Sequence, residues 1–248
     1  MSTYVYGFTR SSHPLRIAGM TGVGAEAPTL RVLRCDDLAA VVSDAPDGLR
    51  ARRRDLETHH RILQALGAGG TVLPMRFGVI APDDVAIEAE LQVEADHYRG
   101  LLTRLAGKVE LNVKAAHRQD AILRALLLED ETLRECNDAL RARGGGSYAD
   151  RVRFGEQLAA AMADRRGQDA RQVLARLEPH ASETRVGAEA GGFVNVSFLV
   201  DAAARQAFEV SFAELQCEMS AVADARVFGP LPPYSFVSPP RTSESWVC

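Results

Sequence analysis

The sequence is poor in the features from which metal centres, disulfide frameworks and membrane anchors are built. Its four cysteines are widely scattered and form no C-x-x-C pair, so they indicate neither a zinc site nor a disulfide-bonded scaffold. No apolar run is long enough to cross a bilayer, and the start lacks a basic region followed by an apolar run. We therefore expect a cytoplasmic protein without membrane insertion, with reduced thiols and no cofactor.

The sequence also lacks an excess of positive charge and any complete catalytic motif. Its formal net charge of -4 gives no general attraction to nucleic acid, which a basic balance normally provides. It contains no nucleophile elbow, no H-E-x-x-H and no complete phosphate-binding loop. What it does have is the composition of an ordinary globular protein, with 46% hydrophobic residues in a chain of 248. This length suits one large or two small domains.

The stretch LPMRFG at residues 73–78 is the most distinctive part of the first half. Read as a strand, it places Leu73, Met75 and Phe77 on one face. Pro74 cannot donate a ladder hydrogen bond, so it confines this strand to a sheet edge, a strand end or a bulge. Arg76 lies between apolar neighbours, and we expect a carboxylate to pair with it. The nearest candidates in sequence are Asp83, Asp84 and Glu88.

The rest of the first half predicts strands at 4–8, 30–34 and 38–43, and helices at 50–66 and 81–106. His59 lies at the centre of the apolar stripe of the first helix, and His60 lies at its edge. A single histidine in such a stripe is typical of a packed core residue, because metal sites need several convergent ligands. Arginines crowd the start of this helix, where the macrodipole disfavours cations. They form either a solvated face or a docking patch for an acidic partner.

The second half begins with a strand in which Val109, Leu111, Val113 and Ala115 alternate with other residues. Helical segments at 119–143 and 147–177 follow, then strands at 181–186 and 194–200, a helix at 204–219 and a strand at 222–228. Without a helical insertion at about 117–146, the order is β-α-β-β-α-β, which is that of a ferredoxin-like domain. We therefore predict an α+β fold with two domains, at residues 1–106 and 107–248.

A proline-rich tail occupies residues 229–248. Three prolines in four positions, at 230–233, favour an extended polyproline II conformation. Tyr234 and Phe236 are its natural anchors. They either pack on the chain's own surface or bind a partner.

Several of these stretches together resemble the GvpF/GvpL family of gas vesicle proteins. They are His59 with residues 61–63, VLPMRFG at 72–78, VELNVK at 109–114 and FGPLPPYSF at 228–236, with YVYG at 4–7 and LAAVVS at 38–43. Two positions depart from the family pattern: Val79 stands where Thr is usual, and Leu231 stands where Trp is common.

The resemblance implies two domains, the second of them ferredoxin-like, and a non-enzymatic accessory role at the gas vesicle. It also implies contact with the small hydrophobic shell protein GvpA and with other accessory proteins. Sheet edges and exposed aromatics suit such a partner. The residues expected to contact partners are Leu73, Pro74, Met75, Arg76, Phe77, Arg52, Arg53, Tyr234 and Phe236.

Two other functions remain open on sequence grounds. A ferredoxin-like domain can bind RNA or a small ligand, although its strands here lack an evident aromatic pair between basic residues. A metal-dependent enzyme would have to use His59 and His60, together with Cys35 or Asp96.

Overall fold

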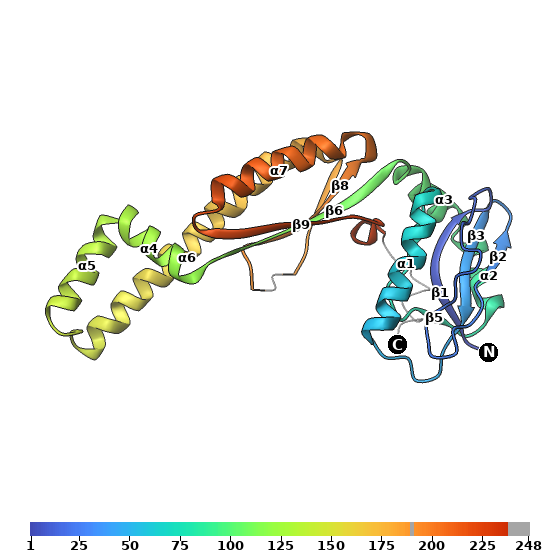
Figure 1. Cartoon of the computed structure of the whole chain (residues 1–248), viewed down its shortest axis with the longest axis horizontal. Helices are drawn as coiled ribbons and strands as arrows, with labels where there is room; N and C mark the ends of the chain where they lie inside the picture. Colours follow the sequence, from blue (N-terminus) through green and yellow to red (C-terminus); the bar gives the residue numbers. More distant parts are fainter. Residues whose placement is uncertain (189–190, 238–248) are drawn as a thin grey trace. The chain divides into compact units, whose positions relative to one another are not determined.

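The computed structural model describes residues 1–188 and 191–237. The chain forms two compact units (Figure 1). The first comprises Met1–Glu110, Asp201–Ala203 and Gly229–Cys248, and the second comprises Leu111–Val200 and Ala204–Phe228. Residues 238–248, the end of the predicted tail including Cys248, lie outside the described residues. The described part of that tail groups with the first unit, whereas the sequence places it with the second half.

The first unit is built on an antiparallel sheet with strand order β2-β3-β1-β4, and β5 also pairs with β1. Its strands are β1 (Thr3–Arg10), β2 (Arg31–Cys35), β3 (Leu38–Asp44), β4 (Leu73–Pro74) and β5 (Ile80–Ala81). The predicted hairpin of β2 and β3 is confirmed by their pairing, from Arg31 with Val42 to Cys35 with Leu38. Asp36 in its turn has a φ of 50°, a conformation that Asp tolerates better than most residues.

Helices cover both faces of this sheet. They are α1 (Arg53–Gly69), α2 (Asp84–Val93) and α3 (Ala95–Arg104). A bulge in β1 between Val5 and Gly7 changes which residues share a face. Tyr4 and Tyr6 therefore pack on His59 of α1, while Phe8 packs on Tyr98 of α3, with ring centroids 4.8 Å apart. The simple alternation of the sequence does not show this switch.

The predicted helices of the first unit are found with changed boundaries. The first begins at Arg53 rather than near residue 50, and Leu56, expected in its apolar stripe, is 42% exposed. The predicted helix over 81–106 is two helices that meet at Glu94, whose ψ is 20°. Ile87, Leu91, Tyr98 and Leu102 are buried on both sides of this break. The apolar stripe thus continues through the break, so it could not reveal it.

The second unit packs two helices on one face of a sheet with strand order β7-β8-β6-β9. Its strands are β6 (Lys108–His117), β7 (Glu183–Val186), β8 (Val194–Asp201) and β9 (Ala223–Leu231). End residues of β6, β8 and β9 belong to the first unit. Its helices are α4 (Gln119–Glu129), α5 (Glu131–Ala142), α6 (Tyr148–Leu177) and α7 (Arg205–Met219). The predicted segment 119–143 is interrupted because Asp130 caps α5, accepting a hydrogen bond from the Leu133 amide at 3.0 Å.

The core of this unit lies between the sheet and helices α6 and α7. Leu111, Val113 and Ala115 of β6 contribute to it as the alternation predicts, while Lys114 is exposed. Phe198 of β8 packs on Phe208 of α7 with ring centroids 5.2 Å apart. A smaller apolar cluster, which includes Ile122, Leu126 and Leu133, joins α4 and α5 to α6.

Candidate functional site

The stretch at residues 73–78 forms a much shorter strand than its sequence predicts. Only Leu73 and Pro74 belong to β4, which lies at the end of the sheet and pairs with Phe8 and Gly7 of β1. The edge position agrees with the expectation from Pro74. Met75 donates one more hydrogen bond, to the Tyr6 carbonyl at 2.8 Å. Burial does not alternate along the stretch, because residues 72–75 are all buried.

A chain of buried hydrogen bonds holds the second half of this stretch. The Gly78 amide donates to the Tyr4 hydroxyl at 3.1 Å, and that hydroxyl lies 2.9 Å from Nδ1 of His59. Nε2 of His59 lies 3.1 Å from the Met75 carbonyl, which can only accept, so Nε2 carries the proton and Nδ1 accepts from Tyr4. The loop from 75 to 78 is thereby fixed to both β1 and α1.

This network also sets the ionisation of its members. Burial lowers the pKa of His59 to about 4, outweighing the opposing hydrogen bond to Met75. Burial raises the pKa of the Tyr4 hydroxyl above its ordinary value. Both groups are therefore neutral at neutral pH, and the stretch is held by uncharged hydrogen bonds in an aromatic surrounding that includes Phe77.

The expected carboxylate partner of Arg76 is not found, and that prediction is wrong. The Arg76 side chain is exposed and forms no ion pair within residues 1–188 and 191–237. Asp84 instead pairs with Arg31 at 2.9 Å, and Asp83 caps α2 by accepting from the Ala86 amide at 2.8 Å. The turn after Met75 directs Arg76 to solvent, so its charge needs no partner.

The two arginines predicted as contacts lie at the start of α1. Arg52 is its N-cap residue and forms no side-chain cap, while Arg53 pairs with Glu57 at 2.7 Å. Both are exposed. The structure brings neither of them into the hydrogen-bond chain around His59.

The tail anchors pack inside the first unit. Phe236 is only 2% exposed, and its carbonyl accepts from Arg104 at 2.7 Å. Ser235 donates twice to the buried carboxylate of Glu110, from its amide at 2.8 Å and its hydroxyl at 2.7 Å. Tyr234 packs against the core under α1, and burial raises the pKa of its hydroxyl. These contacts hold the anchors at 234–236 against the chain itself, which is one of the two outcomes that the sequence leaves open for them.

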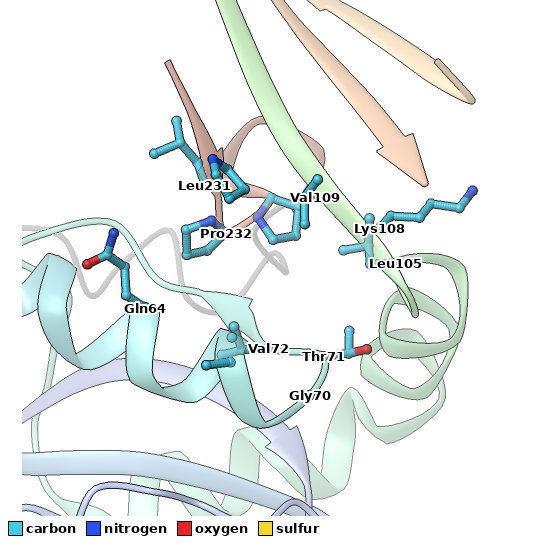
Figure 2. A pocket seen from close by; sticks show the side chains of 13 residues that line it. Gln64, Gly70, Thr71, Val72, Leu105, Lys108, Val109, Leu231 and Pro232 are labelled. Carbon is cyan, nitrogen blue, oxygen red and sulfur yellow. The ribbon is translucent and has the colours of Figure 1, made fainter. Parts of the chain in front are cut away.

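A groove of about 330 Å³ lies where the two distinctive stretches approach each other. Figure 2 shows Leu231 and Pro232 on one side and Val72 on the other. Thr71 and Val72 lead directly into β4, and Pro230–Pro233 lead into Tyr234. The complete lining is Gln64, Gly67, Ala68, Gly70, Thr71, Val72, Leu105, Lys108, Val109, Pro230, Leu231, Pro232 and Pro233.

Most of the groove lining was missed by sequence reasoning. Gly67 and Ala68 lie on the last turn of α1 and are exposed, and a Cβ added at Gly67 would meet nothing within 4 Å. These two small residues line the groove together with the prolines at 230, 232 and 233. The run GAGG at 67–70 is the one signal in the sequence, since glycine is disfavoured within helices and leaves backbone accessible.

The metal hypothesis has no support in the site. Both ring nitrogens of His59 already have hydrogen-bond partners within the buried network. Across the part of the chain that the structure describes, no group of three or more His, Cys, Asp or Glu residues is placed to hold a metal ion.

The described helices include none with the length and hydrophobicity that a membrane crossing requires.

Comparisons with known proteins give a consistent picture. Residues 2–238 match the family model described as gas vesicle synthesis protein GvpL/GvpF. The chain is 45% identical to gas vesicle protein F of Streptomyces sp. (strain CB03234) over 238 residues, which cover 96% of this chain and 100% of that protein. It is 31% identical to gas vesicle protein L of the same strain, over 94% of this chain and 91% of that protein.

The fold is also that of a solved relative. The crystal structure of gas vesicle protein GvpF from Anabaena sp. PCC7120 superimposes with a TM-score of 0.81 and 22% identity, covering 97% of this chain and 99% of that one. The structure of GvpF from Microcystis aeruginosa gives a TM-score of 0.76 and 19% identity, covering 96% of this chain and 99% of that one. With the family model matched over nearly its whole length, this chain belongs to the GvpL/GvpF family of gas vesicle synthesis proteins.

Proposed function

We propose that this protein is a non-enzymatic accessory factor that binds the small hydrophobic shell protein GvpA during gas vesicle assembly. Membership of the gas vesicle synthesis family supports a role in gas vesicle assembly. The groove between the end of α1 and the prolines at 230–233 supports binding of an apolar partner. Other accessory proteins of the vesicle are its further partners. The observation that carries the proposal is an open, largely apolar groove between the two stretches that mark the family.

The groove has the properties needed to hold an apolar side chain of a shell subunit. It is lined by Val72, Leu105, Val109 and prolines, together with the small residues Gly67 and Ala68 of α1. Burying one large apolar side chain there contributes roughly 1.5–3 kcal/mol. Hydrogen bonds from Ser235 to Glu110 and from Arg104 to Phe236 already hold the segment that follows the prolines. Binding at the groove therefore requires little loss of conformational entropy from its walls.

The test is co-expression with tagged GvpA, followed by pull-down of wild-type protein and of Gly67→Leu. The leucine fills the groove while improving helix propensity in α1, so we expect binding to fall at least tenfold without a lower melting temperature. Gly100→Leu is the matched control, because Gly100 is also helical and exposed in the first unit, with nothing within 4 Å of an added Cβ. Equal capture of both variants would refute the groove as the binding site. Failure of GvpA to capture the wild-type protein would refute GvpA as the partner.

We also propose that residues 107–248 contain a ferredoxin-like domain that carries a helical insertion, following an N-terminal α+β domain at 1–106. The strand order β7-β8-β6-β9 supports this, because it is the order expected of a β-α-β-β-α-β domain once α4 and α5 are set aside. NMR contacts between β6 and both β8 and β9 would test it. Contacts between β7 and β9 would contradict it.

A further inference from the structure

Exposed arginines form a basic surface at the start of α1. The surface consists of Arg50, Arg52 and Arg53, beside Leu56, which is 42% exposed. Arg53 pairs with Glu57. Within the described ranges, the side chains of Arg50 and Arg52 form no ion pair or hydrogen bond. These cations stand at the positive end of a helix dipole, where they lower stability, so their placement needs another explanation.

Helix α2 presents a surface of the opposite character. Val85 is 70% exposed and Val93 is 73% exposed, and with Ala89 they form a stripe spaced four residues apart. Glu88 borders this stripe and is exposed. Of the other carboxylates nearby, Asp84 pairs with Arg31 and Glu90 is buried, so Glu88 supplies the charge of this surface. We call Val85, Glu88, Ala89 and Val93 the α2 surface, which is apolar at its centre and carries one exposed carboxylate.

The two surfaces lie on opposite sides of the first unit's sheet. The missing Cβ of Gly7 in β1 would lie 3.3 Å from Leu63 of α1, whereas the next residue, Phe8, contacts Tyr98 of α3. Helix α2 contacts β2 and β3 and is joined to α3 (Figure 1). One copy therefore cannot bring its own two surfaces together, but the arginine surface of one copy can reach the α2 surface of another.

We propose that the chain associates head to tail, with the arginine surface of one copy on the α2 surface of the next. Each surface has an apolar centre, Leu56 on one and the valine stripe on the other, which suits the core of an interface. Their charges are opposite, which favours this pairing over like with like. Such a contact joins two different patches, so it leaves one of each free and adds copies successively. This inference is independent of shell-protein binding.

The experiment uses sedimentation velocity on the full-length protein and two variants. Arg50→Glu/Arg52→Glu reverses the arginine surface, and acidic residues at a helix start complement the dipole, so folding is retained. Glu88→Lys/Val93→Lys reverses the α2 surface at exposed positions, with one lysine in the last turn, where the dipole favours it. We expect the wild-type mass to rise with concentration at low salt and to return to the 26.9 kDa monomer at ~0.5 M salt.

Each variant alone should remain a monomer. An equimolar mixture should associate, because each variant supplies the surface that the other has lost. The quadruple variant carries both reversals, so its charges complement again and it should recover association. Wild-type protein that stays monomeric at every concentration, or a mixture that stays monomeric, would overturn the proposal.

Discussion

The sheets of the two units are covered differently, and their sequences differ accordingly. Helices pack on both faces of the first sheet, and every residue of β1 from Thr3 to Thr9 is buried. In the second unit α6 and α7 share one face, and β6 from Leu111 onward alternates between buried Leu111, Val113 and Ala115 and the exposed or half-buried residues at 112, 114 and 116. Alternation therefore identifies a strand with one covered face, while a strand covered on both faces reads as a continuous apolar run.

The first sheet buries a chain of uncharged polar groups beside the stretch at 73–78. Tyr4, Tyr6 and His59 bury their polar atoms and pair them with Gly78, Ser43, Val23 and Met75. The helix-covered face of the second sheet is closed mainly by apolar packing such as that of Phe198 on Phe208, and the buried side chain of His117 pairs with Asp169 of α6 at 2.7 Å. Uncharged hydrogen bonds therefore hold the stretch at 73–78, whereas close packing of apolar side chains holds most of the second core.

The largest effect should come from removing volume in the second core. Phe198→Ala deletes a fully buried ring in contact with Phe208, and we expect a loss of about 3–5 kcal/mol in unfolding free energy. Urea unfolding followed by circular dichroism measures it. Lys114→Ala, on the exposed side of β6, is the control and should stay within about 0.5 kcal/mol of wild type. A comparable loss in both variants would break the distinction between covered and exposed faces.

Acid should weaken the first unit selectively. The folded pKa of His59, about 4, lies below its ordinary value of 6.5, so the folded state binds fewer protons than the unfolded state. Its contribution is complete above pH 6.5 and falls as the pH drops toward 4. Between pH 7 and pH 5 we expect a loss of about 2 kcal/mol, measured by urea unfolding at each pH.

The matched variant for the pH experiment is His59→Phe, which keeps a ring in the aromatic cluster but cannot titrate. Its stability is lower at pH 7, because the Tyr4 hydroxyl and the Met75 carbonyl lose a partner. Its decline between pH 7 and pH 5 should be correspondingly shallower. An unchanged decline would assign the acid sensitivity to other groups.

The next largest effect on stability should come from removing the Tyr4 hydroxyl. Tyr4→Phe leaves the Gly78 amide and Nδ1 of His59 without their partner, and we expect a loss of about 1–2 kcal/mol. Hydrogen exchange should show faster exchange at Gly78 than at the Val5 amide, which bonds to the Val79 carbonyl. A stability equal to that of wild type would mean that packing alone holds the stretch.

The smallest effect is expected at Arg76. Its side chain is exposed and unpaired among the described residues, so Arg76→Ala should change unfolding free energy by less than about 0.5 kcal/mol. Thermal unfolding measures this. If vesicle assembly fails while stability is kept, Arg76 contacts a partner; a clear fall in stability would contradict its unpaired placement.

Much of the element order could be read from the sequence, because it depends on local periodicity. The alternation of β6 and the apolar stripes of α1 and α7 are examples. The bulge in β1 and the short β4 could not be read, since both depend on strand pairing. The carboxylate for Arg76 was wrongly expected because sequence proximity does not show that Arg31 already holds Asp84.

The candidate groove shows the same limit. Residues 72 and 230–233 border stretches that the sequence identifies, but Gln64, Leu105 and Lys108 come from three other places in the chain. Only folding brings them together. Composition and periodicity indicate which face of a helix or strand is apolar. They do not indicate which elements come together to line a groove.

Gly7 has a consequence for which mutations this family member can tolerate. An added Cβ would lie 2.7 Å from the Leu73 carbonyl oxygen, closer than real contacts allow. That oxygen belongs to the main chain, so every amino acid at position 73 would present it in the same place. No second substitution at position 73 can relieve the clash, and a lineage that loses this glycine has no single-step compensation there except reverting to it.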